Sequence, residues 1–358
     1  MGTAFTVIIA LLVFGFLIFI HEFGHYITAR LFKVTINEFS IGMGPKLVTY
    51  TSKKTNIQYS LGMFPIGGYV AMVGEDEESD DPNAFNKKPA WQRFIITAAG
   101  ATVNIVAGFL AMIIIVSCVN TANTVYGGII NDERLTESYG TDTLDLSVRS
   151  DASGLRVGDE IVKINGKRVK IYDELSYEIM RNGVEPVDVT VIRDGEQMTI
   201  EDVVFPTVIS DGEKFGVVDF MITDYLDKNP ISVFSMAIRR SALVMRMCWE
   251  SVFDLITGRY SLSAVSGPVG ISSAIGEAAR YGFISLLNIT VIISMNLGFM
   301  NLLPIPALDG GRIVVILIEM ITRKKLPARV EAIINGVGLA ALLLLSFVIM
   351  IKDVIGLF

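Results

Sequence analysis

The chain contains two histidines, which stand four residues apart with a glutamate directly after the first. His21, Glu22 and His25 thus form the pattern His-Glu-x-x-His. On a helix, residues four apart lie on the same face, so the two imidazoles can bind one metal ion. The glutamate then lies beside the metal and can take a proton from a metal-activated water. The pattern predicts hydrolytic chemistry at a zinc centre, with Glu22 as the general base.

The motif lies within a segment that is long and apolar enough to span a lipid bilayer. Apolar residues make up 51% of the chain and the mean hydropathy is +0.53, which is typical of a membrane protein. Four segments supply close to the ~20 apolar residues of a spanning helix, namely residues 4–32, 94–119, 283–303 and 333–351. The first lacks the basic lead and the cleavage site of a secretory signal peptide, so we expect it to remain as a span.

A His-Glu-His cluster inside a bilayer is costly unless it is paired or bound to metal. The alternative interpretation is a chance motif, or two core histidines paired with the glutamate.

A net charge of −7 gives no indication of nucleic-acid binding. The two cysteines form neither a disulfide framework nor a Cys-x-x-Cys metal pattern.

Clusters of lysines and arginines occur in two connections, residues 30–93 between the first two spans and residues 312–329 between the last two, while the N-terminal lead has none. The basic residues of the long middle region count little, because long domains translocate largely regardless of charge. The positive-inside rule places these connections in the cytoplasm and both termini outside the cell membrane. The motif stands near the cytoplasmic end of its span, so we expect the metal within the membrane and close to that face.

A zinc ion needs a third protein ligand, and Asp309 is the best candidate. It lies in the stretch NLLPIPALDGG (301–311), whose prolines and glycines break the helix at the cytoplasmic end of the third span. Irregular backbone at membrane depth is tolerated only where protein or a water-filled cavity surrounds it. A helix cap is the alternative role for Asp309, and Glu319 is the competing ligand. Two imidazoles and a carboxylate also suit iron.

The only large polar block, residues 120–226, has the size of one domain. Its sequence predicts two hairpins that turn at Asn165–Gly166 and Asp194–Gly195, and it resembles a PDZ domain of the bacterial membrane-protease type. Residues 229–257 predict an amphipathic helix on the outer membrane surface, because three central arginines would be costly inside lipid.

HEFGHYITAR, the PDZ-like block and NLLPIPALDGGR together resemble the site-2 protease family, in its bacterial regulator of sigma-E protease branch (peptidase family M50). The resemblance implies zinc as cofactor, His21, His25 and Asp309 as its ligands, and Glu22 as the base. It also implies that Asn301 positions the substrate, although an interhelical hydrogen bond is an equal alternative from pattern alone.

Members of this family hold the substrate as an extended strand against a membrane-reentrant β region. The glycine-rich strands within residues 34–74 resemble that region, and they carry four candidate substrate-binding glycines: Gly42, Gly44, Gly67 and Gly68. A cytoplasmic hairpin packed on the bilayer is the alternative. VYGGII (125–130) is the candidate strand and loop for a peptide carboxylate, and SGPVGI (266–271) resembles a family segment near the substrate's path.

We therefore expect an α-helical polytopic membrane protein with four transmembrane helices, a membrane-associated β-hairpin region and one inserted α+β PDZ domain. Its predicted parts are spans one and two (1–119), the extracytoplasmic PDZ domain (120–226), an amphipathic helix and loop (227–282), and spans three and four (283–358).

The expected function is intramembrane proteolysis in a bacterial cytoplasmic membrane. Family resemblance implies single-span substrates already trimmed by an upstream site-1-type protease, such as anti-sigma factors, or remnant signal peptides. A catalytically silent PDZ scaffold is the alternative, and the intact Glu22 and Asp309 oppose it. A zinc transporter or sensor would be expected to show internal repeats or more acidic and histidine sites, which the sequence lacks.

Overall fold

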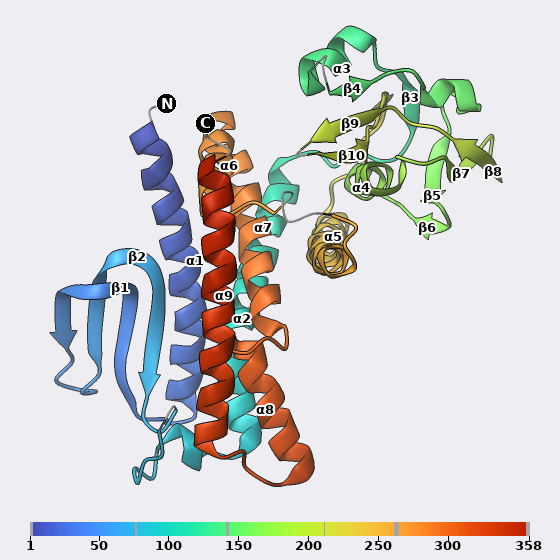
Figure 1. Cartoon of the computed structure of the whole chain (residues 1–358). Coiled ribbons are helices and arrows are strands. Elements are labelled where there is room, and N and C mark those ends of the chain that lie inside the picture. Colours follow the sequence, from blue (N-terminus) through green and yellow to red (C-terminus); the bar gives the residue numbers. More distant parts are fainter. Residues whose placement is uncertain (1–2, 76, 141–142, 211, 261–264, 356–358) are drawn as a thin grey trace. The chain divides into compact units, whose positions relative to one another are not determined.

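The computed structural model describes residues 3–75, 77–140, 143–210, 212–260 and 265–355. The chain forms two compact units (Figure 1), one made of residues 1–112 with 266–358 and the other of residues 113–265. The first unit holds most of the helices and one sheet, and the second holds several small sheets, short helices and one helix of 28 residues. Two helices of the predicted segment 227–282 belong to different units.

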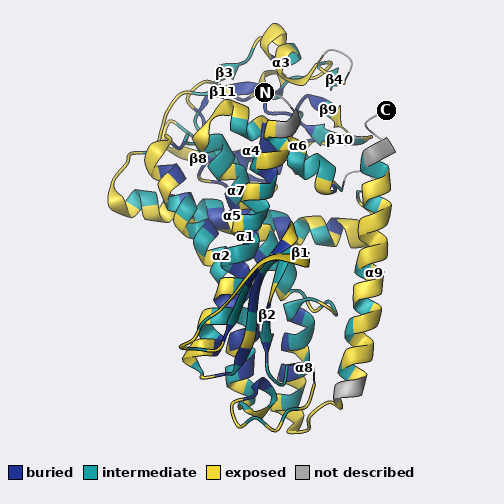
Figure 2. Ribbon diagram, turned by 90° about the vertical axis from the view of Figure 1, so that its left-hand side faces the viewer, coloured by how far each residue is buried: buried dark blue, intermediate teal, exposed yellow. Residues whose placement is uncertain are grey.

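Among the described residues, four helices are long and apolar enough to cross a membrane, as the sequence predicts. They are α1 (Thr3–Leu31), α2 (Ala90–Cys118), α7 (Phe283–Leu302) and α9 (Ala328–Ile355). In the most apolar window of α9 no residue is buried by protein, and Figure 2 shows its exposed surface along most of its length. Because its side chains are predominantly apolar, lipid is the surrounding that suits this helix.

β1 (Ile36–Thr51) and β2 (Gln58–Met72) form one sheet in which each strand bends midway. Residues 38–41 pair with 68–71 on one side and with 58–61 on the other, and 58–61 pair in turn with 48–51. Two strands thus supply four segments. Residues 68–72, called the edge segment below, form one border of the sheet in the pairing of the described residues.

Glycines produce the bends in both strands. Gly42 and Gly44 have φ angles of +81° and +86°, and Gly67 has a φ angle of +78°. Glycine adopts these left-handed angles without the strain that a side chain would cause. The region 34–74 is therefore β structure, as predicted, and its glycines shape the sheet.

The sheet packs against the second half of α1. Phe39, Val70 and Met72 are buried in a core that also holds Ala29 of α1 and Ile96 of α2. Aromatic rings of α1 contact aromatic rings of the sheet, and Tyr26 and Tyr59 share a hydrogen bond of 2.8 Å between their hydroxyls. This packing fixes the edge segment beside the His-Glu-x-x-His helix.

Two further helices belong to this unit, α6 (Pro268–Tyr281), which the sequence did not predict, and α8 (Asp309–Thr322). Asp353 of α9 accepts hydrogen bonds from the backbone N–H groups of Gly267 and Gly270 and so caps the first turn of α6. α8 begins at Asp309 after an irregular loop in which Ala307 has a φ angle of +71°. Figure 1 shows that α1 begins and α9 ends at the same end of the bundle.

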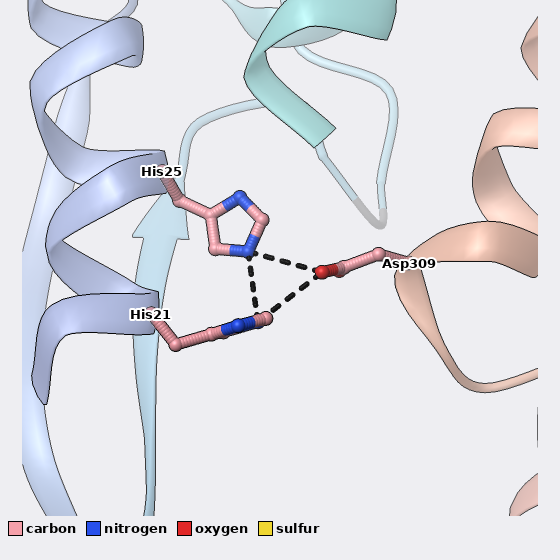
Figure 3. Close-up of side chains that lie close together, drawn as sticks. All are labelled: His21, His25 and Asp309. Carbon is pink, nitrogen blue, oxygen red and sulfur yellow. Dashed lines mark hydrogen bonds and ion pairs between the residues drawn. The ribbon is translucent and has the colours of Figure 1, made fainter. Parts of the chain in front are cut away.

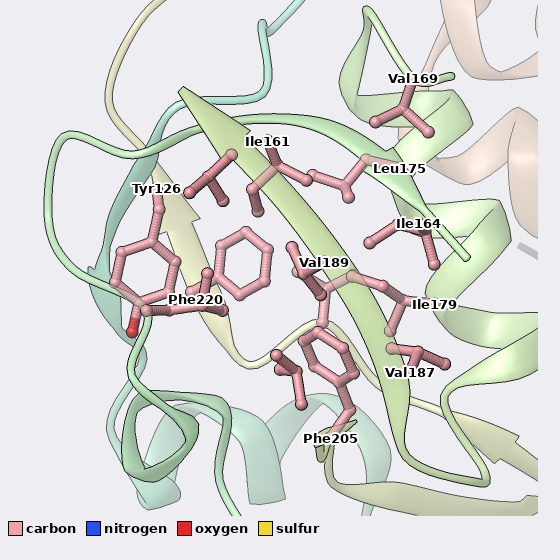
Figure 4. Packing of buried hydrophobic residues seen from close by; sticks show 14 residues of the cluster. Tyr126, Ile161, Ile164, Val169, Leu175, Ile179, Val187, Val189, Phe205 and Phe220 are labelled. Atoms are coloured by element: carbon pink, nitrogen blue, oxygen red, sulfur yellow. The ribbon is translucent and has the colours of Figure 1, made fainter. Parts of the chain in front are cut away.

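The second unit has its own apolar core, built mainly from β-branched and aromatic side chains (Figure 4). A sheet of order β6-β5-β7-β8 forms one wall, and α4 (Tyr172–Asn182) contributes Leu175 and Ile179 to the core. The strands are β5 (Glu160–Ile164), β6 (Lys167–Arg168), β7 (Val187–Arg193) and β8 (Glu196–Val203). Both predicted hairpins are confirmed, with positive φ angles at Asn165, Gly166, Asp194 and Gly195.

Two smaller sheets complete the unit. One joins β3 (Tyr126–Ile129) to β11 (Phe220–Ile222), and the other has the order β10-β9-β4. The remaining elements are α3 (Asp132–Tyr139), β4 (Leu144–Asp145), the 3-10 turn η2 (Ser150–Ser153), β9 (Thr207–Ser210) and β10 (Glu213–Gly216), while η1 (Phe85–Lys87) belongs to the first unit. The candidate peptide loop at 125–130 thus holds β3.

The predicted helix at 229–257 is confirmed as α5 (Pro230–Thr257), which begins with a capping box at Asn229. Its arginines do not lack partners. Arg239, Arg240 and Arg246 form ion pairs with three carboxylates of α4, namely Glu174, Asp173 and Glu178. The contact of α5 with a membrane surface stays a prediction.

Candidate metal centre

His21 and His25 lie on successive turns of α1 and face Asp309 at the start of α8 (Figure 3). Nε2 of His21 lies 3.2 Å from Oδ2 of Asp309, and Nε2 of His25 lies 3.3 Å from the same oxygen. The two Nε2 atoms are 3.3 Å apart. Residues from opposite ends of the sequence therefore bring three potential ligand atoms to one point, with all of them within 4.8 Å of one another.

The donor set suits a zinc ion. Both histidines are buried, and Oδ2 of Asp309 is a buried atom that accepts no hydrogen bond of good geometry from the described residues. Buried carboxylate oxygens normally have a partner, so this oxygen indicates a cation. Two imidazole nitrogens and one carboxylate oxygen would hold zinc with three protein ligands, the number found in catalytic zinc sites.

The backbone of α2 orients one of the imidazoles. Nδ1 of His25 lies 2.8 Å from the carbonyl oxygen of Ile96, an atom that can only accept a hydrogen bond. Nδ1 of His25 therefore carries the ring proton, and the Nε2 lone pair faces Asp309. One turn further along α2, Gly100 lies beside both rings, and a Cβ atom there would overlap Nε2 of His25.

A cavity of about 380 Å³ opens at these residues. Its lining combines the three candidate ligands with Glu22, Thr97, Glu75, Arg312 and the whole edge segment, Gly68 to Met72. Glu22 packs closely on the sheet, because a Cβ atom at Gly68 would stand 3.0 Å from its Cγ. The candidate base, the candidate ligands and one border of the sheet thus share one space.

Other predicted site residues lie elsewhere. The side chain of Asn301 donates a 3.0 Å hydrogen bond to the carbonyl of Leu297 within α7, and Asn301 is not among the residues that line this cavity. Gly42, Gly44 and Gly67 lie at the strand bends, also outside the lining. Of the four glycines, Gly68 lines the cavity.

Glu319, the competitor of Asp309, forms an ion pair with Arg93 of α2. Both side chains are largely buried, at 15% and 11% exposure. A carboxylate that neutralises a buried arginine is committed to that partner. The geometry therefore favours Asp309 as the third ligand, in line with the prediction.

Sequence reasoning missed the contribution of α2. Gly100 gives the imidazoles room, and Asn104 lies beside His21 with its Nδ2 3.3 Å from Nδ1 of the ring. The available signal was the one asparagine in this mostly apolar span, since amide side chains inside membrane helices are rare and commonly functional.

A family model described as peptidase family M50 matches residues 9–345. The chain belongs to peptidase family M50. A protein of Clostridium acetobutylicum, whose name assigns it provisionally to the zinc metalloproteases, is 37% identical to this M50 peptidase over 98% of both chains. A similarly named protein of Fusobacterium nucleatum is 32% identical over 99% of both chains. The regulator of sigma-W protease RasP of Bacillus subtilis is 27% identical over 99% of both chains.

These comparisons confirm the resemblance to the site-2 protease family. This M50 peptidase is a zinc metalloprotease, and with four helices fit to span a bilayer it is an integral membrane protein.

Proposed function

We propose that this M50 peptidase hydrolyses peptide bonds within or near the transmembrane segment of single-span membrane proteins. The observation that carries the proposal is the single cavity in which Glu22, three candidate zinc ligands and the edge segment meet. Its two histidines lie in a helix that is apolar enough to span the membrane. Substrate and water therefore meet at membrane depth.

The edge segment supplies a template for an extended substrate. Its residues pair with β1 along one side, while the other side borders the cavity. A border strand offers unpaired N–H and C=O groups, which can bond to an added strand. A substrate helix must unwind locally to pair in this way, and that exposes its peptide bond to the candidate base.

In the reaction, the water oxygen bonds to the carbonyl carbon of the substrate and the carbon–nitrogen bond breaks. Glu22 takes a proton from the water and passes one to the leaving nitrogen, so the products are a carboxylate and an amine. His21, His25 and Asp309 would hold a zinc ion, which when bound would supply Lewis-acid stabilisation of the negative charge and would lower the pKa of the attacking water. Close packing against Gly68 of the sheet keeps Glu22 in position for both proton transfers.

The proposed setting is a bacterial cytoplasmic membrane with both termini outside. The distribution of basic residues supports this orientation, and so does the start of α1 at the same end of the bundle as the end of α9. The active site then lies near the cytoplasmic face and the unit formed by residues 113–265 lies outside.

We further propose that this outer unit is a PDZ domain that selects or admits substrates trimmed earlier by a site-1-type protease. Two confirmed hairpins and the glycine-containing strand β3 support this assignment. Anti-sigma factors and remnant signal peptides are the proposed substrates, and the name of the Bacillus subtilis relative, regulator of sigma-W protease, supports the former.

Cleavage of a single-span test substrate by the purified protein in detergent tests the proposal. Glu22→Gln removes the base and leaves the three ligands in place, so we expect bound zinc to remain and cleavage to fall at least ~100-fold. Zinc content and product formation are measured on the same samples. Equal cleavage by both proteins would refute the assignment of Glu22, and absence of both zinc and cleavage in the wild type would favour a silent PDZ scaffold.

A further inference from the structure

Asn104 is a completely buried amide in the apolar helix α2. Its exposed fraction is 0%, and its Nδ2 lies 3.3 Å from Nδ1 of His21. Its Oδ1 is also buried and accepts no hydrogen bond from the part of the chain that the structure describes. A buried amide oxygen without a donor destabilises the folded state. A hydrogen-bond donor beside Oδ1 would therefore stabilise the buried amide of Asn104.

The neighbouring imidazole shows what a ligating histidine requires. His25 has its proton on Nδ1, bonded to the carbonyl of Ile96, and its Nε2 lone pair faces the metal position. His21 presents its own Nε2 to the same position. If this Nε2 binds the metal, Nδ1 of the neutral His21 ring must carry the proton and needs an acceptor.

The amide of Asn104 supplies that acceptor after half a turn about its Cβ–Cγ bond. With Nδ2 toward His21, two donors would oppose each other; with Oδ1 toward His21, the ring proton is accepted and the oxygen gains its donor. We propose that Asn104 is a positioning residue that accepts a hydrogen bond from Nδ1 of His21 and so directs Nε2 toward zinc. This inference rests on the proposed metal centre.

The backbone around Asn104 is held in place for this role. Ser294 of α7 donates a 2.8 Å hydrogen bond to the carbonyl of Asn104. Gly298 lets α7 pack closely on α2, since a Cβ there would stand 2.7 Å from the carbonyl oxygen of Ala101. Ile96, Gly100 and Asn104 follow at four-residue spacing on one face of α2, so a single helix face serves both imidazoles.

The test measures zinc affinity of the purified full-length protein in detergent by competition with a chelating dye. Asn104→Ala removes the acceptor, and we expect zinc to bind about 10- to 100-fold more weakly, as for other outer partners of metal-ligating histidines. Asn104→Asp keeps an acceptor oxygen and should restore affinity. Thr102→Val is the matched control, because the exposed Thr102 hydroxyl bonds only within α2 to the carbonyl of Ala98.

A second readout separates positioning from packing. Cobalt(II) replaces zinc, and its visible absorption reports the ligand geometry. We expect Asn104→Ala to shift these bands and Asn104→Asp to retain them. Asn104→Leu, which preserves volume, replaces the alanine variant if that variant fails to fold.

Three results would overturn the inference. Wild-type affinity and spectrum in the alanine or leucine variant would show that Asn104 does not act on the metal. Equal weakening in Asn104→Asp would indicate a packing role alone. Failure of the wild type itself to bind zinc would refute the metal centre as well, which distinguishes the two proposals.

Discussion

Gly100 lies where α2 passes both imidazoles of the metal centre. A Cβ atom on it would overlap Nε2 of His25 and stand 2.8 Å from Nε2 of His21. Because these nitrogens are the candidate ligand atoms, any side chain at this position must displace the atoms that bind zinc. The absence of a side chain is therefore part of the site, although glycine contributes no chemical group.

We expect Gly100→Ala to reduce both bound zinc and proteolysis by at least ~10-fold, since ligand displacement lowers metal affinity. Gly15→Ala is the control in the apolar helix α1, where nothing lies within 4 Å of the added Cβ. Zinc per protein, measured by atomic emission after purification, is compared with the rate of cleavage. Retention of full zinc by Gly100→Ala would show that the imidazoles lie further from α2 than described above.

At the scale of elements, buried ion pairs hold the second unit together. Asp159, directly before β5, accepts two hydrogen bonds of 2.7 Å from Arg193 at the end of β7. Burial raises the pKa of the Asp159 carboxyl, but the hydrogen bonds from Arg193 and from the backbone N–H of Arg156, together with the charges of both arginines, outweigh burial and leave this pKa below its usual value. The Asp159–Arg193 ion pair thus links the start of β5 to the end of the adjacent strand β7.

A pKa lowered in the folded state makes stability depend on pH. The contribution of Asp159 is complete above its unfolded pKa of about 3.9 and is lost as pH falls through the lower folded pKa. We expect Asp159→Asn to lower the melting temperature at pH 7 and the difference from wild type to shrink below about pH 4. Circular dichroism during heating measures this, with exposed Glu201→Gln as control. A difference that is constant with pH would contradict the linkage.

At the scale of the whole molecule, labelling of the two cysteines can test the membrane orientation of the chain. Cys118 is exposed at the end of α2, on the side that we propose to be extracytoplasmic. Cys248 is buried in α5, and burial raises the pKa of its thiol to about 11, which keeps it unreactive at neutral pH.

A membrane-impermeant maleimide should therefore label Cys118 on intact spheroplasts and leave Cys248 unmodified. Lys53→Cys, in the exposed turn between β1 and β2 and in a chain without other cysteines, should react only after permeabilisation. Labelling is read by mass spectrometry. The reverse order of accessibility would invert the proposed orientation of the chain.

Sequence patterns were informative where a constraint is local or periodic. Span lengths, the strands of 34–74 and the two hairpin turns follow from apolar runs and from glycine-containing turns, and the structure has all of them. Asp309 could be predicted as a metal ligand from the sequence, because the irregular backbone around it is unusual at membrane depth. A substrate-binding role of the four strand glycines stays a prediction, since sequence alone does not tell which glycines line a cavity, and Gly68 is the one of the four that lines this cavity.

Contacts between helices could not be predicted from the sequence. The role of Gly100 depends on what faces it, and the pairing of α5 arginines with α4 carboxylates depends on how two helices pack. Helix α6 escaped prediction because glycines interrupt its sequence, and part of its stability comes from Asp353, far along the chain.

The separation of the metal ligands along the chain bears on how the protein is made. His21 and His25 enter the membrane with the first helix, whereas Asp309 follows only after the second unit has been synthesised. A nascent chain therefore carries an incomplete zinc site through most of its translation. Under the function proposed above for single-span substrates, membrane proteins inserted beside the nascent chain meet a complete zinc site only after Asp309 has been synthesised.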